Sequence, residues 1–194
     1  MENLNYIENY LNNSISVKKK LLDDKDLLKR IKKVAEVIQD IYLKGNKVMI
    51  AGNGGSAGDS QHIAAELVSR FFYDRPGLAA IALTTDTSML TAIGNDYGYE
   101  KVFSRQIQAQ GVKGDIFIGI STSGNSKNII EAVNEAKDKG IYTVAMCGSG
   151  GTLSTKVDIS LNMPSDSTPF IQECHIVIGH IICAIVEKSI FPQN

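Results

Sequence analysis

The 194-residue sequence has few of the residues that mark several common classes of protein. It contains no tryptophan, four prolines and only three cysteines, and the cysteines form no CxxC pair. Because each cysteine lies in or next to an apolar run, we expect a reduced intracellular protein and no disulfide framework. The formal net charge is only -1. Nucleic acids and anionic membranes require clustered Lys and Arg, so we expect neither as a partner, and any anionic ligand must be held locally.

The sequence also has little that resembles a secretory signal or a membrane span. No basic segment followed by an apolar stretch stands at the N-terminus. The most apolar segment, residues 170–191, is interrupted by five polar or charged residues: Gln172, Glu173, His175, His180 and Glu187. A membrane span needs about 20 mainly apolar residues with few or no charges. We therefore expect a cytoplasmic protein.

The length suits one compact domain with a helical appendage and is too short for two ordinary enzyme domains. In residues 1–44, predicted as an N-terminal helical extension, apolar residues recur at helical spacing: Leu27, Ile31, Val34, Ile38 and Ile41. The acidic run at residues 23–26 predicts a break or a cap between two helices. Residues 45–194 are predicted to form the domain itself, as a single structural unit.

After residue 45, short apolar runs alternate with helical patterns. The runs predict five strands, at residues 47–51, 78–83, 115–120, 141–146 and 157–163. The stretches between them predict helices or helix-containing connections, at residues 57–72, 88–110 and 126–139, and a final helix beginning at the Ser-Thr-Pro of residues 167–169. Strands separated by helices require right-handed crossovers and a parallel sheet. The predicted fold class is therefore α/β, a three-layer sandwich with a five-stranded parallel sheet flanked by helices.

Open α/β sheets bind ligands at the carboxyl ends of their strands, where two polar loops are predicted. The first loop, GNGGSAG at residues 52–58, fits the dinucleotide pattern GxGxxA, and Asp86 could imitate the ribose-binding acid. A dinucleotide site is nevertheless not favoured. A long helical segment precedes the strand, Asp86 comes later than the ~20 residues expected, and the GK[ST] ending of a nucleotide P-loop is missing.

The second loop, STSGNS at residues 121–126, carries four hydroxyl residues and a glycine between a strand and a helix. Hydroxyls and backbone N–H groups at a helix N-terminus can bind a phosphate dianion without Lys or Arg. A capped turn also uses Ser and Thr. Four hydroxyls within six positions favour a phosphate cradle over a simple cap.

A third pattern has the residue types of a metal site. His62 and Glu66 are four residues apart, and therefore share one helix face directly behind the glycine-rich loop. Such a pair can chelate a metal or form a surface ion pair. The final helix adds four further candidates, among which the spacing does not choose: Gln172, Glu173, His175 and His180. Carboxylate, imidazole and amide ligands without a thiolate suit Zn²⁺ or a related first-row ion.

Three segments together resemble the bacterial sedoheptulose 7-phosphate isomerases, also called phosphoheptose isomerases, of the sugar-isomerase (SIS) domain family. They are AGNGGSAGDSQHIAAEL at residues 51–67, STSGNS at residues 121–126 and TPFIQECHIVIGH at residues 168–180. The resemblance covers nearly the whole chain. It implies the SIS fold, one zinc ion per subunit held by His62, Glu66, Gln172 and His180, and a structural role for His175.

The same resemblance implies a sugar-phosphate substrate, and a homotetramer with sites near the subunit interfaces. The implied substrate contacts are Asn53, Gly54, Gly55, Ser56, Glu66, Asn95, Asp96, Ser121, Thr122, Ser123, Ser126 and Gln172. The implied reaction is the aldose–ketose isomerisation of sedoheptulose 7-phosphate to D-glycero-D-manno-heptose 7-phosphate. That is the first step toward nucleotide-activated heptoses for lipopolysaccharide, capsule or other surface glycans.

An isomerisation through an enediol(ate) needs a base at carbon and an acid at oxygen. Our hypothesis assigns Glu66 as the base and His180 as the acid that moves the second proton. Asp59, one turn before His62, is expected either to orient that imidazole or to cap the helix.

Two alternatives stay open at this point. One is a non-catalytic SIS module that binds a sugar phosphate or a replication-initiator protein. The other is an isomerase for a different phosphosugar, because the motifs select a phosphate and a ketose end but not a chain length. The presence of all four implied metal ligands favours the isomerase.

Overall fold

The computed structural model describes residues 2–193, and within them the chain forms one five-stranded sheet. All strand pairs are parallel, in the order β2-β1-β3-β4-β5. The strands are β1 Val48–Gly52, β2 Ala80–Ala82, β3 Ile116–Ser121, β4 Tyr142–Cys147 and β5 Ile159–Asn162. The predicted class and strand number are confirmed, and each strand boundary lies within two residues of its predicted position.

The helices also follow the predicted order. They are α1 Glu2–Asp23, α2 Lys25–Leu43, α3 Gly55–Val68, α4 Thr87–Tyr97, α5 Ser104–Gln110, α6 Lys127–Asp138 and α7 Thr168–Ile190, with 3-10 turns at Tyr99–Lys101 and Thr152–Thr155. The predicted break at residues 23–26 is confirmed, because Asp24 caps α2 by accepting from the N–H of Leu27 at 2.9 Å. The stretch predicted at residues 88–110 is divided, since Gly98 ends α4 with a φ of 87°.

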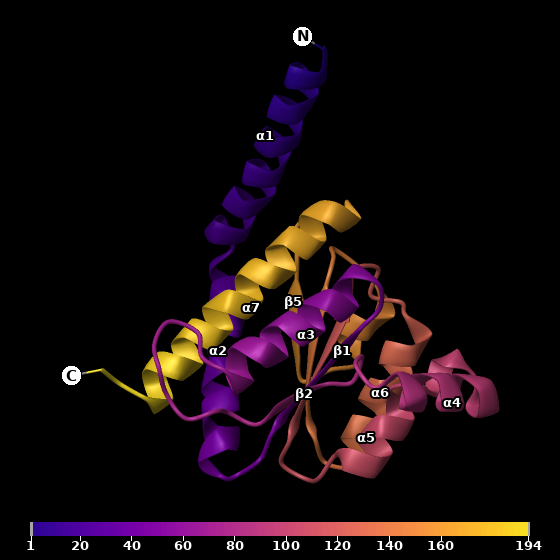
Figure 1. The fold of residues 1–194 in the computed structure, drawn as a ribbon. Helices are drawn as coiled ribbons and strands as arrows, with labels where there is room; N and C mark the ends of the chain where they lie inside the picture. Colours follow the sequence, from indigo (N-terminus) through magenta and orange to yellow (C-terminus); the bar gives the residue numbers. More distant parts are fainter. Residues whose placement is uncertain (1, 194) are drawn as a thin grey trace.

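Helices cover both faces of the sheet (Figure 1). Alternate residues of β1 point to opposite faces, so Val48 and Ile50 pack in the core beneath α2, α3 and α7. Met49 and Ala51 pack in the second core, beneath α5 and α6. All five residues of β1 are buried, as expected of a central strand in a parallel sheet. The three-layer sandwich is therefore confirmed.

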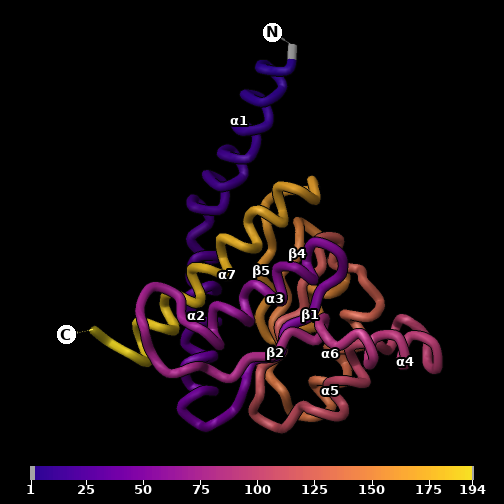
Figure 2. The backbone as a smooth tube through the Cα atoms, in the orientation of Figure 1, coloured from indigo at the N-terminus to yellow at the C-terminus, as the bar shows by residue number. Residues whose placement is uncertain are grey.

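The two N-terminal helices are placed differently. The apolar stripe predicted for residues 27–41 is buried, and α2 lies in the helical layer over the sheet. In contrast, α1 projects beyond the rest of the molecule (Figure 2) and leaves Leu4, Ile7 and Leu11 more than half exposed. It is attached to α7 through Glu173, which accepts a hydrogen bond from Lys18 at 2.6 Å. The predicted boundary at residue 44 stays a prediction.

One helix in the described part of the chain, α7, is long and apolar enough to cross a membrane by length and composition. Soluble core helices pass the same test. Its buried face packs against α2 and α3 through Ile171, Cys174, Ile178, Ile182 and Val186. Its opposite face leaves Val177 and Ile181 exposed by 36% and 38%. α7 thus has a core role and an additional apolar surface.

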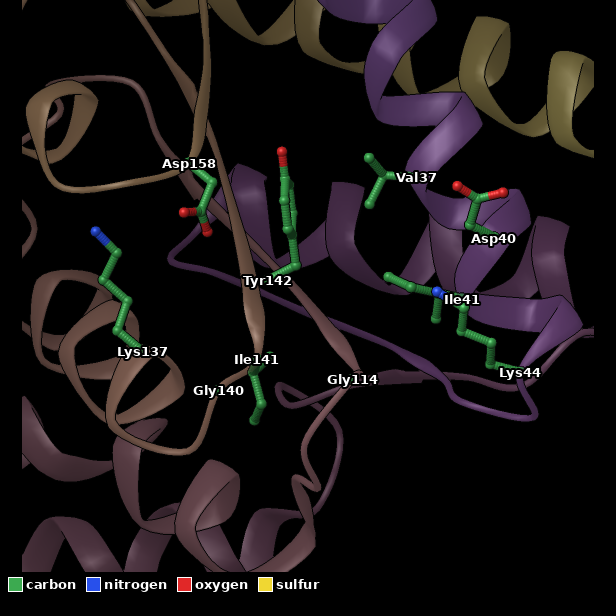
Figure 3. Close-up of a pocket in the computed structure, with 10 residues that line it drawn as sticks. All are labelled: Val37, Asp40, Ile41, Lys44, Gly114, Lys137, Gly140, Ile141, Tyr142 and Asp158. Atoms are coloured by element: carbon green, nitrogen blue, oxygen red, sulfur yellow. The ribbon is translucent and has the colours of Figure 1, made fainter.

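A large groove of about 620 Å³ lies between α2 and the start of β4 (Figure 3). Its polar lining consists of Asp40, Lys44, Lys137, Tyr142 and Asp158. The groove is at the amino ends of the strands, because Tyr142 is the first residue of β4. Open α/β sheets bind their ligands at the opposite edge. The size of this groove therefore does not identify it as the functional site.

Candidate functional site

The strand order places a crevice at the carboxyl ends of β1 and β3. The chain passes from β1 to β2 on one side and then crosses to β3 on the other, so the connections after β1 and β3 diverge. A cavity of about 310 Å³ lies there, at the small end of the range for small-molecule sites. It is lined by Asn53, Gly54, Gly55, Ser56, Ile120, Ser121, Thr122, Ser126, Thr168 and Gln172. Eight of these ten are predicted substrate contacts.

The hydroxyl-rich loop forms one wall of this cavity. The Oγ atoms of Ser121 and Ser126 lie 2.8 Å apart, and the Oγ of Ser123 lies 3.5 Å from that of Ser121. Ser126 occupies the N-cap position of α6, yet its hydroxyl makes no capping hydrogen bond within residues 2–193. The hydroxyl pairs with that of Ser121 instead of capping α6, so both hydroxyls lie at the positive end of the helix, where an anionic ligand is favoured.

Gly124 gives this loop its shape. Its φ is 64°, and a Cβ there would lie 2.4 Å from the carbonyl oxygen of Gly150. Gly151 approaches equally closely from the other side, because its own Cβ would lie 2.5 Å from the Cα of Gly124. The loop thus packs backbone against backbone with the segment after β4, which only glycine permits.

The two loops are joined by a pair of amides that sequence reasoning missed. The Nδ2 of Asn53 donates to the Oδ1 of Asn128 at 3.0 Å, and the Nδ2 of Asn128 donates back to the Oδ1 of Asn53 at 2.8 Å. Tyr99 adds a hydroxyl donor to the Oδ1 of Asn53 at 3.2 Å. Asn128 is 4% exposed, on the same helix face as the buried Ala132. The sequence pattern that could have identified Asn128 is a single polar residue on the apolar face of a predicted helix.

Gln172 reaches the cavity from α7 and contacts the glycine-rich loop. A Cβ on Gly55 would lie 2.4 Å from its Nε2 atom. Gly55 therefore has to be a glycine for the amide to take this position. Thr168, at the start of α7, lines the same cavity and was interpreted from sequence only as part of a helix start.

The metal-type residues form a cluster farther along α3 and α7. The Nε2 of His62 lies 3.0 Å from the Oε1 of Glu66 and 3.1 Å from the Nε2 of His180. The candidate ligand atoms of these three residues all lie within 4.8 Å of one another. Two imidazole nitrogens that face each other can both act as acceptors only if a cation lies between them. The three residues can thus hold a divalent ion, and their nitrogen and carboxylate donors fit Zn²⁺.

Gln172 lies about two turns before His180 on α7. It precedes His180 by eight residues, which corresponds to about 12 Å along α7. Asn95 and Asp96 are also elsewhere, on the exposed end of α4, where the Nδ2 of Asn95 donates to the Oδ1 of Asp96 at 2.8 Å. Neither lines the cavity. Their contact with substrate stays a prediction.

Two further titratable groups lie near the site. His175 is fully buried and donates from Nε2 to the carbonyl of Cys147 at 3.2 Å. Burial lowers the pKa of His175 to about 4, so its imidazole is neutral at pH 7. The Oδ2 of Asp59 is buried without a hydrogen-bond partner in the described chain, so neither contact predicted for it is formed. Burial raises the pKa of Asp59, and the nearby His62 opposes that shift.

Comparison with known proteins agrees with this geometry. The family model described as the SIS domain matches residues 9–148. The sequence is 59% identical to phosphoheptose isomerase 2 of Campylobacter jejuni, over 100% of this chain and 98% of that protein. It is 58% identical to the phosphoheptose isomerase of Aneurinibacillus thermoaerophilus, over 97% of this chain and 96% of that one. The chain belongs to the phosphoheptose isomerase family.

A solved structure of a phosphoheptose isomerase from Francisella tularensis has the same fold, with a TM-score of 0.93 at 38% identity. The alignment covers 97% of this chain and 100% of that one. The resemblance to phosphoheptose isomerases and the SIS fold are thus confirmed. A match over the full length to phosphoheptose isomerases does not favour a non-catalytic SIS module.

Proposed function

We propose that the protein isomerises sedoheptulose 7-phosphate to D-glycero-D-manno-heptose 7-phosphate. The observation that carries the proposal is the placement of two chemically different sites along the same pair of helices. A hydroxyl-lined cavity suited to a phosphate lies where α3 and α7 begin. The cluster of His62, Glu66 and His180, called the acid–base cluster below, lies farther along both helices. Membership in the phosphoheptose isomerase family supplies the substrate.

The phosphate end of the substrate is held without a cationic side chain. Hydroxyls of Ser121, Thr122, Ser123 and Ser126 would donate to the phosphoryl oxygens, and the N-terminus of α6 supplies positive potential. This explains why a protein of net charge -1 can bind a dianion. Asn53 and the backbone of residues 54–56, with Gln172, would bind the sugar hydroxyls.

The reaction requires two proton transfers. Glu66 removes a proton from C1 of the ketose and returns it to C2. His180 accepts the proton of the C1 hydroxyl and delivers it to the oxygen on C2, so that the carbonyl moves from C2 to C1. The Nε2 of His62 lies 3.1 Å from that of His180 and 3.0 Å from the Oε1 of Glu66, so the imidazole of His62 contacts both proton-transferring groups.

Zn²⁺ is the proposed cofactor, one ion per subunit, held by His62, Glu66 and His180. When bound, the ion supplies Lewis-acid stabilisation of the negative charge on the sugar oxygens. A carboxylate that is fully bound to a cation is a poorer base. Glu66 would therefore act as the base through a carboxylate oxygen that the ion leaves free.

We propose a homotetramer in which a second copy completes the site. Within one chain Gln172 would have to span about 12 Å to become the fourth ligand beside His180. Two exposed apolar surfaces could contact that second copy. One consists of Val177 and Ile181 on α7, and the other of Leu4, Ile7 and Leu11 on α1. Mixing refolded Gln172→Ala and His180→Gln subunits should restore activity that neither variant has, and the mass in solution should be that of four chains. Persistent inactivity of the mixture would place both residues in the same subunit's site.

We also propose a cytoplasmic location, where phosphorylated sugars are confined by their charge and the three buried free thiols stay reduced. The product would enter the synthesis of nucleotide-activated heptoses for lipopolysaccharide or capsule.

The test of the proposed function is incubation of the Zn²⁺-loaded protein with sedoheptulose 7-phosphate, followed by NMR. Appearance of the aldose signal at C1 supports the proposal, and sedoheptulose without phosphate should be converted far more slowly because the cradle is empty. A protein that binds the sugar phosphate and converts none of it would contradict the proposal.

A further inference from the structure

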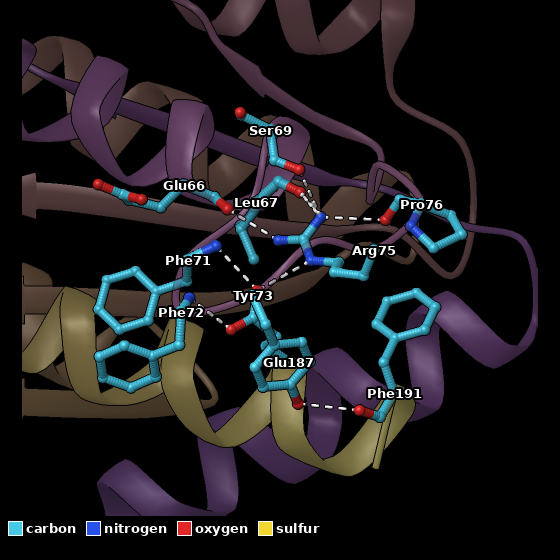
Figure 4. A network of polar contacts seen from close by, with 10 residues as sticks. All are labelled: Glu66, Leu67, Ser69, Phe71, Phe72, Tyr73, Arg75, Pro76, Glu187 and Phe191. Carbon is cyan, nitrogen blue, oxygen red and sulfur yellow. Dashed lines mark hydrogen bonds and ion pairs between the residues drawn. The ribbon is translucent and has the colours of Figure 1, made fainter. Parts of the chain in front are cut away.

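A buried ion pair lies directly beyond the acid–base cluster, and nothing in the proposed reaction uses it (Figure 4). The Nε of Arg75 donates to the Oε1 of Glu187 at 3.1 Å, and the two side chains are only 2% and 1% exposed. A buried ion pair is weak evidence for a role in stability, because its desolvation offsets much of the Coulombic gain. Its contacts, rather than its charge, indicate what it does.

Arg75 holds the C-terminal end of α3. Its Nη2 donates to the carbonyl of Glu66 at 2.8 Å, and its Nη1 donates to the carbonyl of Leu67 at 2.6 Å and to that of Ser69 at 3.2 Å. These carbonyls lie in or just beyond the last turn of the helix, where acceptors lack intrahelical donors and a cation is favourable. One guanidinium thus fixes the turn that carries the proposed base.

Glu187 holds the segment that follows α3. Its Oε1 accepts from the N–H of Phe71 at 2.8 Å, and its Oε2 accepts from the N–H of Phe72 at 2.7 Å. Burial acts to raise the pKa of Glu187, but these hydrogen bonds and Arg75 outweigh it and keep the pKa below its usual value. The ring of Phe71 then lies 5.5 Å from the ring of His180, measured between centroids.

The Arg75–Glu187 pair is connected to His180 through α7 and to Glu66 through the end of α3. Glu187 follows His180 by seven residues, two turns along the same face of α7. On the other side, Arg75 binds the carbonyl of Glu66 itself. We propose that Arg75 and Glu187 are positioning residues, which set the distance between Glu66 on α3 and His180 on α7 and so shape the metal-binding and proton-transfer cluster. The inference rests on the proposed function of that cluster.

The chain offers a matched control at the other end of the sheet. The carboxylate of Asp115 is fully buried, accepts the N–H groups of Lys47 at 3.0 Å and Val112 at 2.9 Å, and pairs with the ammonium of Lys47 at 2.7 Å. It therefore resembles Glu187 in burial and in partners. It lies at the amino ends of β1 and β3, opposite the cavity.

The experiment compares Glu187→Gln with Asp115→Asn in the full-length protein. Zn²⁺ affinity is measured by competition with a chromophoric chelator, Co²⁺ coordination by its visible absorption, and kcat and KM with sedoheptulose 7-phosphate. We expect Glu187→Gln to weaken Zn²⁺ binding about 10-fold or more, to alter the Co²⁺ spectrum, and to lower kcat by a similar factor. KM should stay within about 2-fold, because the phosphate cradle is remote from the pair. Asp115→Asn should leave all these quantities within about 2-fold at a similar loss of thermal stability.

Two results would overturn the inference: Glu187→Gln with the Zn²⁺ affinity and Co²⁺ spectrum of the wild type, or equal losses in both variants. If Glu187→Gln does not fold, Arg75→Lys decides instead, since it keeps the positive charge but cannot donate to Glu187 and to the carbonyls of Glu66 and Leu67 at once. An unchanged Zn²⁺ affinity and Co²⁺ spectrum in Arg75→Lys would then refute the inference. A wild-type protein that binds Zn²⁺ but isomerises nothing would refute the proposed function alone, and the Zn²⁺ comparison would still test the positioning role.

Discussion

Replacing Gly55 with alanine should separate the stability of α3 from the binding of substrate. The new Cβ would lie 2.4 Å from the Nε2, 3.0 Å from the Cδ and 3.1 Å from the Oε1 of Gln172. Contacts this short cannot persist, and the end of a flexible side chain gives way more easily than backbone. The amide of Gln172 should therefore turn away from the cavity while the fold stays intact.

The expected size of the effect follows from what moves. The displaced amide loses one or two hydrogen bonds to the sugar, each contributing about 1 kcal/mol, so KM should rise about 5- to 30-fold. The helix itself should not suffer, because alanine is favoured over glycine within helices by up to about 1 kcal/mol. Gly55 is the first residue of α3, so only part of that gain is expected.

Gly58 is the matched control, one turn later on the same helix. A Cβ at Gly58 has no atom within 4 Å, so Gly58→Ala should gain helix stability without touching Gln172. We expect an increase in Tm of about 2–4 °C for Gly58→Ala and an unchanged KM. Initial rates with sedoheptulose 7-phosphate and thermal unfolding measure both quantities. If Gly55→Ala has the same KM as Gly58→Ala, the contact between Gly55 and Gln172 does not position a substrate ligand.

Five further changes test other parts of the site and fold. Glu66→Gln and His180→Gln should each lower kcat by about 100-fold or more while calorimetric binding of the sugar phosphate stays within about 3-fold; near-normal turnover would contradict the assigned roles. Asn128→Leu removes the hydrogen-bond partner of the Asn53 amide in the glycine-rich loop. It should raise KM and lower the free energy of unfolding in urea by about 1–3 kcal/mol. An unchanged KM would show that other contacts hold the two loops together. Burial acts to raise the pKa of Asp115, but hydrogen bonds, the one from Lys47 first among them, hold this pKa below its ordinary value of 3.8. Its stabilising contribution is therefore complete above about pH 4 and is lost as the pH falls through the lower folded pKa, so acid titration of the unfolding free energy should be flatter in Asp115→Asn. Removal of divalent ions with a chelator should abolish isomerisation and Zn²⁺ should restore it; full activity after chelation would exclude a metal role.

Local sequence patterns were sufficient for the strands and for the cavity. Each strand is a short apolar run between turn residues, and the sheet buries both of its faces, so burial and run length coincide. The two polar loops follow β1 and β3, which are neighbours in the sheet. Parallel neighbours end at the same edge, so residues 53–56 and 121–126 had to meet.

Pairing between distant helices could not be predicted from spacing. His62 and His180 are separated by 118 residues, and only the packing of α3 on α7 brings their Nε2 atoms to 3.1 Å. Spacing likewise could not choose between His175 and His180, because both lie on one helix. The structure distinguishes them: His175 is turned toward the carbonyl of Cys147 beneath α7, and His180 is turned toward α3.

The sequence by itself thus determined the α/β class, the strand order along the chain and the residue types of the phosphate loop. These depend on periodicity and on turn chemistry, which act over a few residues. The tertiary structure alone decided that Asn128 ties the two loops together, that Gln172 lies over Gly55, and that Arg75 and Glu187 hold the ends of the two helices. Those contacts join segments far apart in the chain, and their distances depend on how the helices pack, which no local pattern encodes.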